Sequence, residues 1–146
     1  MFKRFLVVCS GNICRSPLAE VLLKQYLPHV EVRSAGTATK QSELEGFPAD
    51  STMVSVANDI GIAIDEHKAH QLTKEDCLWS DIVLVMEPEH IVSVAKVSTQ
   101  ARGKTFLLGQ WGEGSIEDPF LKSLDCYHAA ATQIRSACQS WSKKLN

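Results

Sequence analysis

The sequence predicts an α/β fold, a single doubly wound four-stranded parallel sheet with helices on both faces. Two observations predict it. Short, continuous apolar runs, typical of strands buried on both faces, are separated by amphipathic stretches of helical length. Strands that alternate with helices favour a parallel sheet. Ligands of such sheets bind beyond the carboxyl ends of the strands, so we expect a functional site at that edge.

The first apolar run, residues 5–9, predicts a strand that leads directly into a loop rich in small and polar residues. Pro17 suits the first position of a helix with Ser16 as its N-cap, and Pro28 ends this helix. Residues 30–34 predict a second strand. The following segment, residues 35–50, is rich in Gly, Ser and Thr and predicts a long functional loop.

The second half of the chain repeats the alternation of helices and strands. Residues 51–60 predict a helix that Gly61 stops, and Thr73 with Asp76 predicts a capped helix start. The remaining elements are a strand at 81–86, a helix at 88–97, a strand at 104–108, a loop at 109–121 and a closing helix at 123–145. We find no linker or repeat, so we predict one domain spanning residues 1–146.

Composition excludes several classes of function. A net charge of −2 gives no broad attraction to nucleic acid or to a membrane surface. No apolar stretch approaches the roughly 18 residues that a membrane span needs, and the N-terminal run is too short for a signal peptide. We therefore expect no nucleic-acid partner and no stable membrane insertion.

The five cysteines indicate a reducing compartment, because their number is odd, their spacing is uneven and no Cys-x-x-Cys pair occurs. We therefore expect a cytoplasmic protein. No cluster of His and Cys has the spacing of a zinc site, and no carboxylate pair suggests magnesium. We expect no metal and no cofactor. The cysteines are Cys9, Cys14, Cys77, Cys126 and Cys138.

The chemistry is concentrated between a strand end and a helix start, at residues 9–16. Backbone N–H groups of such a loop can turn inward to hold an anion. Arg15 supplies a planar fork for two phosphate oxygens. Cysteines beside a helix N-terminus and a cation have pKa values of about 3.5–7.5, so we expect a thiolate at Cys9. The intervening loop residues are Ser10, Gly11, Asn12, Ile13 and Cys14.

The string Cys9-Ser-Gly-Asn-Ile-Cys-Arg-Ser-Pro17 closely resembles the phosphate loop of the low-molecular-weight protein tyrosine phosphatases. The resemblance extends through Ser34-Ala-Gly36 and residues 67–76 to Ile116-Glu-Asp-Pro-Phe120. It implies that Cys9 is the nucleophile, Arg15 the phosphate clamp and Asp118 the general acid. It also implies that Asn12, Ser16, Ser34 and His67 hold the loop in shape.

A general acid makes chemical sense beside this loop, because a phenolate with a pKa of about 10 leaves poorly without a proton. Glu117 is the alternative carboxylate. His70 departs from the resemblance, because the family usually has arginine at this position. Cys14 either packs beneath the loop or traps an oxidised Cys9 as a disulfide, and both interpretations stay open.

The resemblance also implies a substrate. Phe120 and Leu121, where animal members carry two tyrosines, are expected as a substrate wall, and with Trp111 they favour the bacterial branch. That branch typically acts on tyrosine autokinases of polysaccharide export, so we expect a phosphotyrosine protein of this kind as partner. Two alternatives use a loop cysteine: an arsenate reductase on the same fold, for which Cys77 is the candidate resolving thiol, and a phosphate carrier without hydrolysis.

Overall fold

Four strands form one parallel sheet in the order β2-β1-β3-β4, which confirms the predicted fold class. The computed structural model describes residues 2–145. The strands are β1 (Arg4–Cys9), β2 (Glu31–Gly36), β3 (Ile82–Val85) and β4 (Thr105–Leu107). Because β1 pairs with β2 on one side and β3 on the other, its carboxyl end lies where the chain order of the sheet reverses. Cys9 is the last residue of this strand.

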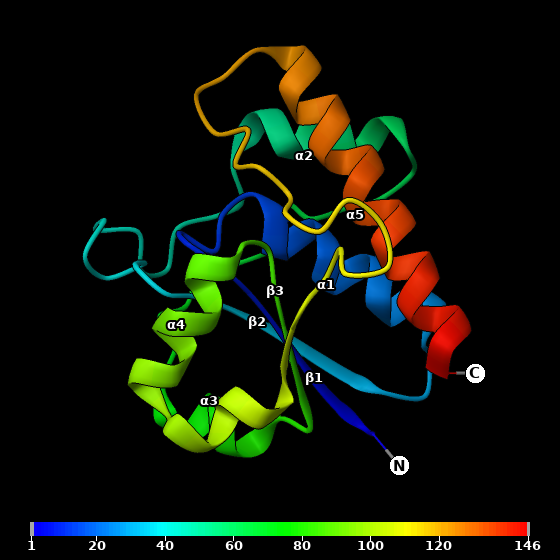
Figure 1. Cartoon of the computed structure of the whole chain (residues 1–146). Helices are drawn as coiled ribbons and strands as arrows, with labels where there is room; N and C mark the ends of the chain where they lie inside the picture. Colours follow the sequence, from blue (N-terminus) through cyan, green and yellow to red (C-terminus); the bar gives the residue numbers. More distant parts are fainter. Residues whose placement is uncertain (1, 146) are drawn as a thin grey trace.

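Helices cover both faces of the sheet, as Figure 1 shows. The first face packs against α1 (Arg15–Tyr26), α2 (Ser51–Asp59) and α5 (Leu124–Leu145), and the second against α3 (Lys74–Trp79), α4 (Pro88–Val97) and the 3₁₀ helix η1 (Thr99–Lys104). Side chains along β1 alternate between the two cores: Phe5 and Val7 face the first, Leu6 and Val8 the second. The continuous apolar run of β1 thus reflects burial on both faces.

Local signals set several helix ends. Asp50 caps α2 by accepting a hydrogen bond from the Met53 N–H at 3.1 Å. Gly61 follows α2 with φ +78, which confirms it as the stop signal. Thr73 and Asp76 form the predicted capping box, with bonds of 2.9 and 3.1 Å. Within residues 2–145, no helix is long and apolar enough to cross a membrane.

Candidate active site

The loop between β1 and α1 turns its carbonyl groups outward. Each carbonyl from Cys9 to Ile13 accepts a hydrogen bond from a donor outside the loop, at 2.6 to 2.9 Å. The backbone N–H groups are thereby directed to the inside, toward the N-terminus of α1, where an anion is favoured. The donors, in order, are Thr37 N, Ala38 N, Thr39 Oγ1, His67 Nε2 and Asp50 N.

Asn12 holds the bend of this loop. Its φ of +61 places it in the left-handed region, as expected for this residue type. Its amide oxygen accepts from the His70 N–H at 2.8 Å, which leaves the amide nitrogen to donate to Ser16 at 2.8 Å and to Ser34 at 3.0 Å. Every polar group of this buried side chain is thus engaged. Gly11 leaves room for the Leu44 side chain, since a Cβ at this position would lie only 3.1 Å from Leu44 Cδ1.

Ser16 does not cap helix α1, contrary to the sequence prediction. The helix begins two residues earlier than predicted, at Arg15 in place of Pro17, and its N-cap position, Cys14, makes no side-chain cap. Ser16 Oγ lies 2.9 Å from Cys9 Sγ instead. Because Ser16 Oγ accepts from the Asn12 amide, its own hydroxyl proton is directed to the sulfur. Cys9 also receives the Asn12 backbone N–H at 3.3 Å.

Arg15 is the largest buried polar side chain beside the loop, with 1% of it exposed. One terminal nitrogen donates to the Glu87 carboxylate and, at 2.7 Å, to the Ile116 carbonyl. Its Nε is buried and has no hydrogen-bond partner within residues 2–145. Since an unpaired buried N–H is costly, the free edge of the guanidinium fits an anion in the adjoining pocket.

A pocket of about 260 Å³ opens above the loop. Asp118 lines it, and one of its carboxylate oxygens lies 3.8 Å from Arg15. Glu117, the alternative carboxylate, is exposed and does not line the pocket. The remaining lining includes Cys9, Ser10, Ile13, Leu44 and Phe120.

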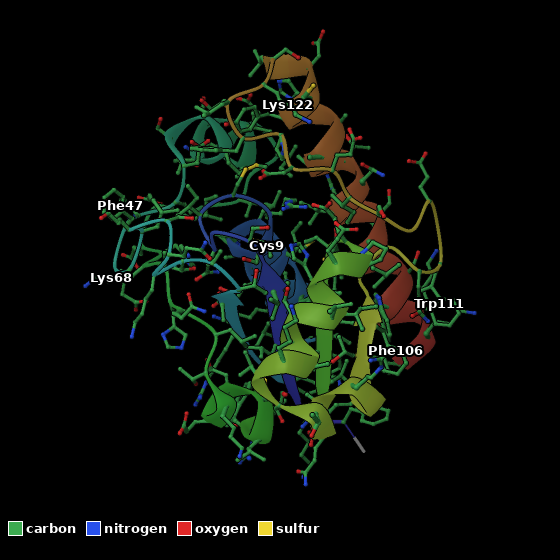
Figure 2. The ribbon with its side chains drawn as sticks, turned by 60° about the vertical axis from the view of Figure 1, so that its left-hand side comes forward. Cys9, Phe47, Lys68, Phe106, Trp111 and Lys122 are labelled. Carbon is green, nitrogen blue, oxygen red and sulfur yellow. The ribbon has the colours of Figure 1, made fainter. Side chains whose placement is uncertain are left out.

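The pocket walls only partly follow the sequence prediction. Phe120 lines the pocket, whereas Leu121 is 85% exposed and lies outside the lining. The long loop contributes Ser42 and Leu44, which sequence reasoning did not single out. Trp111 packs edge-on against Trp141, with ring centroids 5.8 Å apart, away from Cys9 (Figure 2).

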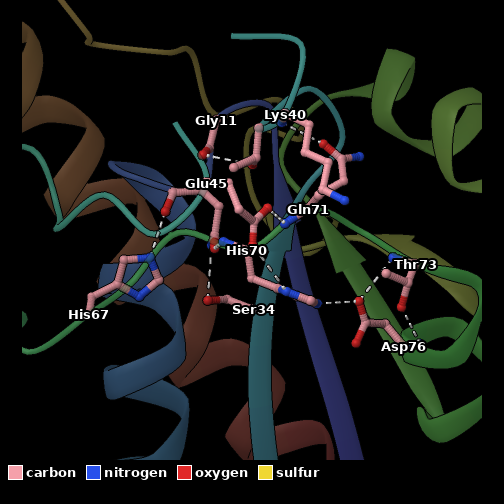
Figure 3. A network of polar contacts seen from close by, with 11 residues as sticks. Gly11, Ser34, Lys40, Glu45, His67, His70, Gln71, Thr73 and Asp76 are labelled. Carbon is pink, nitrogen blue, oxygen red and sulfur yellow. Dashed lines mark hydrogen bonds and ion pairs between the residues drawn. The ribbon is translucent and has the colours of Figure 1, made fainter. Parts of the chain in front are cut away.

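Two histidines support the loop from outside, in the polar network of Figure 3. His67 Nε2 donates to the Asn12 carbonyl at 2.6 Å, and burial lowers the pKa of His67, so the ring stays neutral. The His70 ring lies 2.8 Å from Asp76 and 3.8 Å from Glu45. His70 thus connects the long loop to helix α3.

Three functional contacts come from residues that sequence reasoning missed. Glu20 accepts from the Ser34 hydroxyl at 2.5 Å and extends the network around Asn12. Glu87 pairs with Arg15, and His90 lies 2.9 Å from Ser10. Burial opposes ionisation of Glu87, but Arg15 outweighs it and lowers the pKa of this carboxyl. Glu87 and His90 have the spacing of an ordinary helix start, which does not indicate a role in the site.

A buried cysteine at the end of the first strand, below an anion-binding loop with an unpaired arginine nitrogen, indicates an enzyme that holds an oxyanion above a loop cysteine. Comparison with known proteins makes this specific. The family model for low molecular weight phosphotyrosine protein phosphatase matches residues 4–146, and the chain belongs to this family.

Individual relatives support this family assignment. The chain is 42% identical over 146 residues to the low molecular weight protein-tyrosine-phosphatase Etp of Escherichia coli, covering 99% of this chain and 96% of Etp. The structure of Vibrio vulnificus Wzb in complex with benzylphosphonate superposes with a TM-score of 0.96 at 41% identity, covering 99% of both chains. The YwlE arginine phosphatase of Geobacillus stearothermophilus superposes with a TM-score of 0.87 at 36% identity, covering 98% of this chain and 92% of YwlE. The chain is thus a protein-tyrosine-phosphatase, and the arsenate reductase alternative is not favoured.

Proposed function

We propose that the enzyme hydrolyses phosphotyrosine through a cysteinyl phosphate on Cys9. The observation that carries this proposal is the unpaired Nε of Arg15, buried beside the ring of inward N–H groups. Both fit the oxygens of a phosphoryl group held above the Cys9 sulfur. The remaining loop residues, from Ser10 to Cys14 and Ser16, shape this anion site.

In the first step the Cys9 thiolate attacks phosphorus, and the bond from phosphorus to the tyrosine oxygen breaks. Asp118 gives its proton to the departing phenolate. In the second step the Asp118 carboxylate takes a proton from water, the water oxygen attacks phosphorus, and the bond to sulfur breaks. The Ser16 hydroxyl stabilises the sulfur anion that is released. Ser34 and His67 hold Asn12 and therefore the loop.

The pocket walls support an aromatic substrate. Ile13, Leu44 and Phe120 line the pocket with apolar surface, against which a tyrosine ring can pack. A phosphoarginine side chain would bring a polar guanidinium to the same wall. We therefore propose phosphotyrosine over phosphoarginine, and we propose that a bacterial tyrosine autokinase of polysaccharide export is the partner, on the resemblance to the bacterial branch.

We further propose that residues 1–146 act as one phosphatase domain, because both helix layers pack on the same sheet. A cytoplasmic location is proposed from the odd number and uneven spacing of the cysteines. The mechanism uses only the side chains named above and water. We therefore propose that the enzyme needs neither a metal nor a cofactor.

The test compares phosphate release from peptides that carry phosphotyrosine, phosphoserine, phosphothreonine or phosphoarginine. We expect release from the phosphotyrosine peptide, its loss in Cys9→Ser, and retained vanadate binding by that variant. Cys126→Ser is the matched control, since Cys126 is exposed and distant from the loop in sequence. Hydrolysis by Cys9→Ser would overturn the covalent mechanism. A clear preference for phosphoarginine would overturn the substrate.

A further inference from the structure

The second residue of the loop carries a polar side chain that the mechanism above does not use. Ser10 lines the pocket beside Cys9 and Asp118. Its hydroxyl lies 2.9 Å from His90 Nε2 on helix α4, and this is its one hydrogen bond within residues 2–145. A hydroxyl can both donate and accept, so the state of His90 decides which role is left for a ligand.

The tautomer of His90 follows from its other nitrogen. The backbone N–H of Glu87, which can only donate, points to His90 Nδ1 at 3.2 Å. Nδ1 must therefore present its lone pair, and the ring proton resides on Nε2. His90 then donates to the Ser10 oxygen. The hydroxyl proton of Ser10 is left for another acceptor.

This arrangement persists at neutral pH because His90 stays uncharged. The residue is 4% exposed, and burial together with the nearby Arg15 charge lowers its pKa to about 4, against the opposing effects of Glu87 and Asp118. The N-terminus of α4 thus makes two contacts with the site: Glu87 orients Arg15, and His90 orients Ser10.

We propose that His90 is a positioning residue that makes the Ser10 hydroxyl a donor to the phosphoryl group bound in the pocket. This inference rests on the proposed function, because it takes the pocket to be the phosphate site. Ser10 then adds one side-chain hydrogen bond to those from the backbone and Arg15. It contributes to recognition of the oxygens and not to bond making.

Two conservative variants separate the roles of His90. In His90→Asn the side-chain oxygen can still accept from the Glu87 N–H, but nothing reaches Ser10. In His90→Gln the amide N–H can reach Ser10, but the acceptor for Glu87 is lost. The measurements are inhibition by inorganic phosphate and kcat/KM for an aryl phosphate, in these two variants, in Ser10→Ala and in the double variant Ser10→Ala/His90→Asn.

We expect Ser10→Ala and His90→Asn each to weaken phosphate inhibition and kcat/KM about tenfold, as for a hydrogen bond to a charged group. The double variant should be no worse than Ser10→Ala alone, because His90 acts on the phosphoryl group only through the Ser10 hydroxyl. His90→Gln should keep most of the affinity. Unchanged phosphate inhibition in Ser10→Ala, or additive losses in the double variant, would overturn the proposal.

A spectroscopic measurement checks the tautomer without turnover. In the wild type at neutral pH, a two-dimensional ¹⁵N–¹H spectrum of the histidine rings should show His90 as the neutral Nε2–H form, and this signal should be absent from His90→Asn. An Nδ1–H form or an imidazolium would overturn the proposal. An enzyme that binds phosphate as expected but does not hydrolyse phosphotyrosine would instead count against the proposed function.

Discussion

The Asp118 carboxylate lies 3.8 Å from the Arg15 guanidinium, yet the two side chains differ greatly in exposure. The Arg15 side chain is 1% exposed and that of Asp118 is 45% exposed. Arg15 can therefore hold the phosphoryl group from within, while Asp118 can meet both a leaving group and water at the mouth of the pocket. This geometry suits a group that first gives and then takes a proton.

Asp118→Asn should lower kcat/KM by a factor of about 10²–10⁴ for aryl phosphates with poor leaving groups, because the leaving oxygen loses its proton donor. The loss should shrink for leaving groups that need no proton. Rates over a leaving-group series measure this dependence. Glu117→Gln is the control and should behave as the wild type. An equal loss across the series would remove Asp118 from the role of acid.

Gly36→Ala should damage the phosphate loop more than the fold. A Cβ at this position would lie 2.1 Å from Thr39 Oγ1 and 2.6 Å from the Ser10 carbonyl oxygen, so the loop must shift. We expect weaker phosphate inhibition and a large loss of kcat/KM, measured beside the Tm. Gly103→Ala is the matched control, since a Cβ there meets nothing within 4 Å. Full activity of Gly36→Ala would contradict this prediction, because it would mean that the phosphate loop can shift without losing its function.

The stability of the protein should fall on mild acidification, partly through His90. Its ring faces Arg15, Glu87 and Asp118, and its pKa falls from 6.5 to about 4 on folding, chiefly by burial and then by Arg15. Between these two pKa values the unfolded chain therefore binds a proton at His90 that the folded protein does not. The stability that the neutral ring contributes is complete above pH 6.5 and is lost toward pH 4. Denaturant unfolding at several pH values gives the free energy of unfolding. Between these limits its slope against pH should be smaller in His90→Asn than in the wild type, by about 1.4 kcal/mol per pH unit. Identical pH dependence in both proteins would contradict this.

His70→Arg should leave activity unchanged and raise stability slightly, by at most about 1 kcal/mol. The ring of His70 already lies between the carboxylates of Asp76 and Glu45, and arginine can pair with both. The bond that matters for the loop comes from the His70 backbone N–H to Asn12, which the substitution keeps. Activity profiles against pH check this. A clear change in the profile would mean that the imidazole tunes the site.

Oxidation should distinguish the two roles left open for Cys14. Peroxide is expected to oxidise Cys9 first, and a disulfide with Cys14 would protect it from further oxidation. Cys14 is 3% exposed, and burial and then the nearby Cys9 raise its pKa, so trapping should be slow. We expect dithiothreitol to restore the wild type and Cys126→Ser, but to restore Cys14→Ser only in part. Full rescue of Cys14→Ser would leave Cys14 a packing residue.

Much of the fold was predictable because its signals are local. The apolar run of β1, the capping box of Thr73 and Asp76, and Pro88 at the start of α4 each depend on a few neighbouring residues. The left-handed turn at Asn12 fits its residue type, because asparagine adopts this conformation more readily than most residues. The Ser16-Pro17 pair misled, because it resembles an N-cap although the helix begins at Arg15 and the Ser16 oxygen accepts from the Asn12 amide.

The missing parts of the site come from distant segments. Glu87 and His90 look like an ordinary helix start, and nothing in their immediate sequence indicates that they face Arg15 and Ser10. Leu44 was hidden in a long loop whose path only the tertiary structure sets. Local patterns specify elements, whereas a pocket wall depends on how those elements pack.

The many external contacts of the phosphate loop also bear on how the enzyme is made. Asn12 depends on Ser34 and His70, and the Ile116 carbonyl that holds Arg15 lies 101 residues further along the chain. A chain synthesised from its N-terminus exposes Cys9 long before these partners exist. We therefore expect the phosphate site around Cys9 to form only when the whole domain has folded. Return of activity during refolding should accordingly coincide with the last, global step.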